Sequence, residues 1–137
     1  MKRIILTLLV ILPFVLSAQT PQWIWPDRAE KSEIVYFRKV VELAFTNNDP
    51  MPMMHNLVLV KPESRLEIVT AAATMGAAGM ANSFVPKSDK VIAYTPLVLT
   101  GNTYKLYFKA PTDPGKYEYI CTYPGHGLTM WGILHVK

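Results

Sequence analysis

Short apolar stretches separated by turn-forming residues run through most of this chain. The stretch 103–109 alternates, with Tyr104, Leu106 and Phe108 on one face and polar or amphipathic groups on the other. This period of two indicates a β-strand with one buried face and one wet face. By composition and by flanking Pro, Gly, Asn or Asp residues, we expect further strands at 34–45, 57–60, 66–70, 91–95, 116–121 and 132–137.

Strands of this length and spacing predict an all-β domain, an antiparallel sandwich or barrel. One segment departs from the pattern. Residues 71–83 are rich in alanine, which favours helix, whereas Gly76 and Gly79 weaken it. We therefore expect a short helical flap inserted between strands in the middle of the chain.

The first residues have the pattern of a secretory signal peptide. Lys2 and Arg3 precede an apolar run over 4–16, which ends at the small residues Ser17 and Ala18. The run is shorter than the roughly 20 apolar residues that span a bilayer, although a single-pass anchor remains the alternative. We expect residues 1–18 to be removed and the mature chain to be periplasmic or secreted.

Composition narrows the function classes. The chain has 137 residues, half of them hydrophobic, which suits one domain with a buried core. Its formal net charge of +4 falls when Lys2 and Arg3 are lost, leaving 12 basic and 10 acidic residues. A near-neutral domain is a poor candidate for binding nucleic acid, which needs a concentrated basic face.

The single cysteine, Cys121, excludes an internal disulfide and invites a closer look at its neighbours. It could be a buried inert residue, a metal thiolate, a nucleophile or an intermolecular bridge. His126 and Met130 follow it on one predicted hairpin loop, with a tight turn at Pro124-Gly125. A thiolate, an imidazole and a thioether are ligands for a soft metal, and two His, one Cys and a weak axial Met make a blue copper site.

A second histidine is needed to complete such a set. His135 lies between Leu134 and Val136 in the last predicted strand, where alternation points it away from the core. His55 remains, just ahead of the apolar strand at 57–60.

Two segments together resemble the cupredoxins of the azurin and auracyanin type. The first segment is 47–49 followed by 55–58, and the second is 121–130. The 65 residues between His55 and Cys121 suit the branch of the family that has a helical flap. Tyr117 resembles the family's tyrosine corner. The resemblance covers about 42–137 and implies a Greek-key sandwich or barrel. Residues 19–41 form an N-terminal segment of open assignment, a candidate first strand.

The resemblance implies roles for individual residues. His55, Cys121 and His126 would be the strong ligands of one Cu(I)/Cu(II) ion and Met130 the axial ligand. Beyond these ligands, Asn56 would fix the ligand loop and bond near the sulfur, and the Tyr123 backbone N–H would donate to it. Met54 stands where azurins have a glycine whose carbonyl approaches the metal.

Four protein ligands leave no open position for a substrate, which argues against an enzyme and favours a carrier of single electrons. A c-type cytochrome, or a haem or copper domain of a dehydrogenase or reductase, would dock on the apolar patch around His126. Two other hypotheses stay open. One is a copper carrier or chaperone; the other is a non-redox secreted β-sandwich binding module, suggested by Trp23 and Trp25. A dinuclear copper centre needs two cysteines and is excluded.

Overall fold

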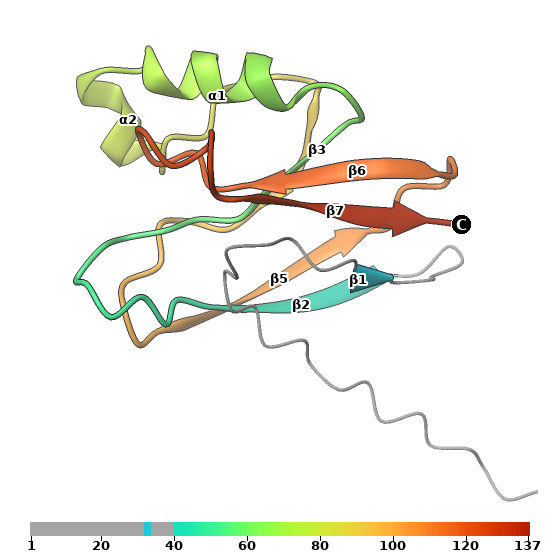
Figure 1. The fold of residues 1–137 in the computed structure, drawn as a ribbon, viewed down its shortest axis with the longest axis horizontal. Coiled ribbons are helices and arrows are strands. Elements are labelled where there is room, and N and C mark those ends of the chain that lie inside the picture. The colour runs from blue at the N-terminus through green and yellow to red at the C-terminus, as the bar shows by residue number, and fades with distance from the viewer. Residues whose placement is uncertain (1–31, 34–39) are drawn as a thin grey trace, which may run out of the picture.

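Two stacked β-sheets form the body of the molecule (Figure 1), a computed structural model that describes residues 32–33 and 40–137. The larger sheet has the strand order β1 (Ser32–Glu33), β7 (Trp131–Val136), β6 (Gly115–Ile120), β3 (Val58–Val60) and β4 (Val91–Tyr94). The smaller pairs β2 (Val40–Thr46) with β5 (Thr103–Lys109). All neighbours are antiparallel except β1 and β7.

The predicted all-β fold is confirmed, and two separate sheets make it a sandwich. The chain passes from β4 to β5 in the other sheet and returns to place β6 beside β3, as in a Greek key. The expected signal peptide and residues 19–31 and 34–39 lie outside the described residues. Within the described ranges, none of the helices has the length and apolarity to cross a membrane.

Strand β3 is buried on both faces, which explains its unbroken apolar sequence. Leu57 and Leu59 enter the core between the sheets, where Phe45, Leu106 and Tyr119 also lie. The alternating residues Val58 and Val60 enter a second core on the outer face of the larger sheet. Since neither face meets water, polar alternation is absent here.

Helix α1 (Arg65–Ala73) packs on this outer face, and α2 (Ala77–Ala81) follows it beyond the end of the sheet. The strand predicted at 66–70 is wrong, because those residues belong to α1. Ile68 and Ala72, four residues apart, are each 1 % exposed against the sheet, whereas Leu66 is 58 % exposed. The β-branched residues in α1 favour a strand locally, but burying one helical face overrides that preference.

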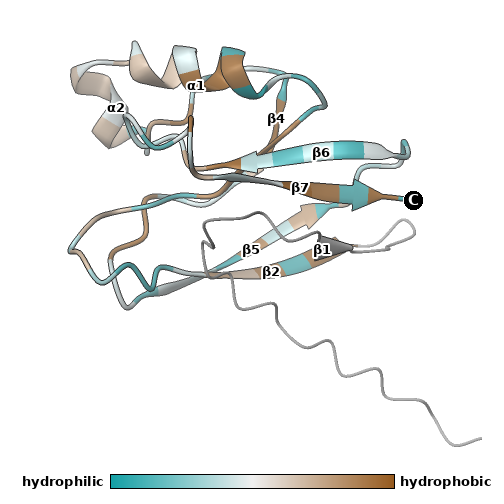
Figure 2. Ribbon diagram, in the orientation of Figure 1, coloured by the Kyte–Doolittle hydropathy of each residue, from teal (hydrophilic) through white to brown (hydrophobic). Residues whose placement is uncertain are grey.

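The helical flap predicted at 71–83 is confirmed as helical, but the predicted start is too late, because the helical region begins at Arg65. Gly76, with φ +55°, separates the two helices, a conformation in which glycine avoids the steric cost of a side chain. Figure 2 shows apolar colour on β4 and on part of α1, two of the elements around the second core, and on parts of β7.

Tyr117 and Tyr104 test two further expectations from the sequence, a tyrosine corner and an inward-facing side chain. The Tyr117 hydroxyl donates to the backbone carbonyl of Asp113 at 2.9 Å, which is the geometry of a tyrosine corner. Tyr104 was expected to face inward with Leu106 and Phe108, but it is 40 % exposed. It lies at the start of β5 and lines an open groove with Tyr94.

The loop that follows β6 packs against α1 through Gly127. A Cβ atom at Gly127 would overlap the side chain of Val69 and lie 3.0 Å from the Cys121 carbonyl oxygen. A Cβ atom at Gly115 would meet the Tyr117 ring at an ordinary 3.7 Å.

We therefore expect Gly127→Ala to lower the free energy of unfolding by about 1–3 kcal/mol, the usual cost of overpacking. Gly115→Ala should stay within about 0.5 kcal/mol. Urea unfolding of the metal-free proteins measures both. Equal midpoints for the two variants would show that the loop does not pack closely on the helix.

Candidate metal centre

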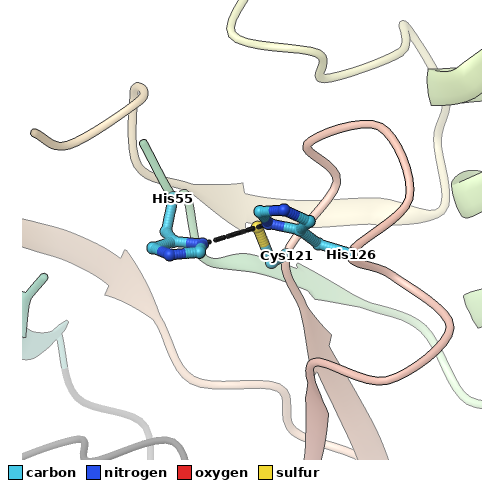
Figure 3. Close-up of side chains that lie close together, drawn as sticks. All are labelled: His55, Cys121 and His126. Atoms are coloured by element: carbon cyan, nitrogen blue, oxygen red, sulfur yellow. Dashed lines mark hydrogen bonds between the residues drawn. The ribbon is translucent and has the colours of Figure 1, made fainter. Parts of the chain in front are cut away.

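Three side chains from two parts of the chain meet at one end of the sandwich (Figure 3). His55 precedes β3, Cys121 follows β6, and His126 lies on the loop between β6 and β7. The Cys121 Sγ lies 3.7 Å from His55 Nδ1 and 3.6 Å from His126 Nδ1. The two Nδ1 atoms are 3.2 Å apart. His55 and Cys121 are buried, and His126 is partly exposed.

These separations suit one metal ion in the middle of the triangle. Zinc makes bonds of about 2.0 Å to imidazole and about 2.3 Å to thiolate. Bonds of that length at angles of about 120° would give edges of about 3.7 Å between nitrogen and sulfur and about 3.5 Å between the nitrogens. The observed edges lie within about 0.3 Å of these values. A soft thiolate with two imidazoles also fits Cu(I) and Cu(II) chemically.

Sheet register brings the first two ligand positions together. Val58 of β3 lies opposite Ile120 of β6 in an antiparallel pair. The residues just before β3 and just after β6 therefore lie at the same end. His55 is further held by Val98, with backbone hydrogen bonds of 3.2 Å and 2.7 Å in the two directions.

The loop that carries His126 is closed by its own backbone. The N–H of His126 donates to the Tyr123 carbonyl at 3.0 Å, and Gly125 has φ +86°. These features, with Pro124, match a type II turn and confirm the tight turn predicted there. Met130 N–H donates to the His126 carbonyl at 2.8 Å, and Cys121 N–H to the Met130 carbonyl at 3.0 Å.

Asn56 links the two ligand segments. Its Oδ1 accepts the Thr122 backbone N–H at 2.8 Å, and its Nδ2 donates to Thr122 Oγ1 at 2.8 Å. The same amide donates to the Ser83 carbonyl, beyond α2, at 2.7 Å. Asn56 and Thr122 are both buried, so this bridge ties the segments next to His55 and Cys121 in a region without competing water.

The surroundings shift two of the three donor groups in opposite directions: the pKa of the Cys121 thiol is raised overall, which favours the protonated thiol, and the pKa of His126 is lowered, which favours the neutral imidazole. Burial raises the pKa of the Cys121 thiol, while hydrogen bonds from the backbone N–H groups of Asn56 and Tyr123 lower it. Burial lowers the pKa of His126, and nearby His55 lowers it further. His126 is thus a neutral imidazole at pH 7, the form that binds metals.

The remaining predicted residues lie close to this cluster. Met130 is half-buried, and its backbone pairs with Cys121 as described. Met54 is half-buried directly before His55. Tyr123 packs beside His126, with ring centroids 4.9 Å apart. His135 lies on β7 opposite Lys116 and outside the cluster, as alternation predicted.

Sequence reasoning gave no role to Asp49, whose Oδ2 lies 2.8 Å from His55 Nε2. Hydrogen bonds from the Met51 backbone N–H and then from His55 lower the pKa of this carboxyl. The only hint of this contact in the sequence is the cluster of turn-forming residues at 47–50. Such a cluster predicts Asx turns but not the direction in which the Asp49 carboxylate points.

Comparison with known proteins agrees with this geometry. The family model described as copper binding proteins, plastocyanin/azurin family, matches residues 30–137, beginning within the N-terminal segment of open assignment. Auracyanin-B of Chloroflexus aurantiacus is 39 % identical over 101 residues, 71 % of this chain and 41 % of that protein. Azurin iso-2 of Methylomonas sp. strain J is 36 % identical over 99 residues, 68 % of this chain and 74 % of that protein.

A solved structure of auracyanin A, a "blue" copper protein of Chloroflexus aurantiacus, superposes with a TM-score of 0.66 and 33 % identity. The match covers 79 % of this chain and 87 % of that one. The chain spans less than half of auracyanin-B and 66 % of the full auracyanin-A sequence. With a family match over most of its length and a His-Cys-His cluster at one end of a two-sheet sandwich, this chain belongs to the plastocyanin/azurin family of copper-binding proteins, the cupredoxins.

Proposed function

We propose that this chain is a periplasmic or secreted blue copper protein that carries single electrons. His55, Cys121 and His126 hold one copper ion, and Met130 is its weak axial ligand. The observation that carries the proposal is the triangle of donor atoms, each within 4.8 Å of the others in a mostly buried site. The apolar run before Gln19 supports export.

The ion, when bound, supplies a Cu(I)/Cu(II) couple, and the chain supplies a fixed frame. Cys121 provides the thiolate, and the N–H groups facing its sulfur moderate its charge. The hydrogen bonds of His55 with Val98 and of Asn56 with Thr122 hold the donors in place. A frame that need not rearrange between the two oxidation states permits fast electron transfer.

Of the three donors in the triangle, His126 is the one that is partly exposed, and exposed apolar residues lie on its loop and on the segment before His55. Met51 is 59 % exposed and Leu128 is 63 % exposed, and Pro52 and Pro124 are also exposed. An exposed apolar patch of this kind suits a small, transient contact. The partner we propose is a c-type cytochrome, or a haem or copper domain of a dehydrogenase or reductase.

A copper carrier would need ligands that exchange easily. The closed loop around His126 and the two-way backbone pairing of His55 argue against easy exchange. Slow release of copper to a chelator supports the electron carrier, and fast release supports the carrier of copper. Binding of a sugar by the metal-free protein would support the third hypothesis, a binding module.

The proposal is tested first by adding Cu(II) to the mature protein. We expect one copper per chain and an intense visible band from charge transfer between the thiolate and copper. Cys121→Ser removes the sulfur and should abolish the band. A colourless product, or a band that survives this substitution, would contradict the assignment.

Met130→Gln tests the axial ligand. An amide oxygen is a harder donor than a thioether and favours Cu(II), so the reduction potential should fall while copper stays bound. Voltammetry measures the potential. An unchanged potential together with a loss of stability would show that Met130 only fills space.

Leu128→Lys tests the docking patch. Two copies of the variant bring like charges together, so electron self-exchange should slow markedly while the absorption spectrum stays unchanged. Salt at 1 M, with a Debye length of about 3 Å, should restore part of the rate. Leu66→Lys, on the outer side of α1 and 58 % exposed, is the matched control. Equal rates for the two variants at low salt would place the electron exit elsewhere.

A further inference from the structure

The two ring nitrogens of His55 face different partners. Nδ1 points into the cluster with Cys121 and His126, and Nε2 lies 2.8 Å from Asp49 Oδ2. His55 is 1 % exposed, while the Asp49 side chain is 23 % exposed. The carboxylate therefore lies behind the buried ring, on the side away from the donor cluster.

An ionised carboxylate can only accept hydrogen bonds. The ring proton of neutral His55 must therefore be on Nε2, which leaves the Nδ1 lone pair directed at the cluster. A carboxylate behind a ligating histidine also makes the ring a stronger donor.

On the basis of the function proposed above, we propose that Asp49 is a positioning residue for the copper ligand His55. It holds the ring proton on Nε2, fixes the ring plane and strengthens Nδ1 as a donor, which favours Cu(II) over Cu(I).

Asp49 is itself held by the frame that holds His55. Its Oδ1 accepts the Met51 N–H at 2.9 Å, and its own N–H donates to Asn47 Oδ1 at 3.0 Å. The Asn47 amide, which is buried, donates to the carbonyls of Met53 at 2.7 Å and Val98 at 2.8 Å. Since Val98 also pairs with the His55 backbone, both members of the Asp49–His55 pair are anchored to one network.

The two carboxylate oxygens of Asp49 have different partners, so its contact with His55 can be tested apart from its part in closing the turn. Oδ1 closes the turn, and Oδ2 faces the ring. An asparagine keeps only one acceptor oxygen, so Asp49→Asn can satisfy the turn or His55 but not both. Asp49→Ala removes both acceptors. The double variant Asn48→Asp/Asp49→Ala returns a negative charge at the neighbouring exposed residue without the bond to His55.

The first measurement uses the metal-free protein. Long-range ¹H–¹⁵N correlation spectra at pH 8 report which nitrogen of each histidine carries the proton. We expect His55 to be protonated on Nε2 in the parent and to become a mixture of tautomers in Asp49→Ala. A parent His55 protonated on Nδ1, or the same single tautomer in both proteins, would overturn the proposal.

The second measurement uses the copper-loaded protein. Removing such a partner typically weakens metal binding about 10–100-fold, and we expect Asp49→Ala to lose more Cu(II) than Cu(I) affinity. Each tenfold excess loss raises the reduction potential by about 59 mV. Asp49→Asn should shift it in the same direction. The double variant should stay close to Asp49→Ala, because charge alone does not replace the bond.

The outcomes distinguish this inference from the function on which it rests. A blue parent whose potential is unchanged in Asp49→Ala, or a double variant that returns to the parent potential, would overturn the role of Asp49 alone. A parent that binds no copper through sulfur would overturn the proposed function, and the tautomer spectra would then still test the hydrogen bond. Thermal unfolding of each metal-free variant checks that the fold is retained.

Discussion

The antiparallel pairing of β3 with β6 is the constraint on which the rest of the structure depends. Val58 lies opposite Ile120, and both side chains are fully buried. A slip of one residue would exchange the two faces of a strand, which here would exchange the two apolar cores. The pairing that satisfies both cores also puts His55 and Cys121 at the same end of the sheet. Core packing thus fixes the geometry of the metal centre.

Buried polar side chains near that end of the sheet hold the ligand segments together through hydrogen bonds. Asn47, Asn56 and Thr122 are buried, a costly arrangement unless their hydrogen bonds are made. Here they are used to join the chain before β3 with the chain after β6 and with the loop around Val98. None of these bonds uses His55 Nδ1, Cys121 Sγ or His126 Nδ1. The frame is therefore expected to hold the donor atoms in place before copper binds and in both oxidation states.

How much could be predicted from the sequence differs between parts of the molecule. Cys121 and His126 share one loop, and His55 precedes an apolar strand, so local pattern was enough to propose the ligands. Helix α1 was missed because the β-branched residues at 68–70 favour a strand, while the burial that decides the matter is against a distant sheet. The contact of Asp49 with His55 depends on the path of the five residues between them, for which the sequence carries only turn propensity.

The central claim is that the fold, and not the metal, builds the site. Crystal structures of the metal-free and the Cu(II)-loaded protein test it most directly. The account predicts that His55 Nδ1, Cys121 Sγ and His126 Nδ1 keep their mutual separations within about 0.5 Å, the tolerance of a preorganised site. A metal-free structure in which these side chains turn apart, or in which the loop between β6 and β7 refolds, would contradict it.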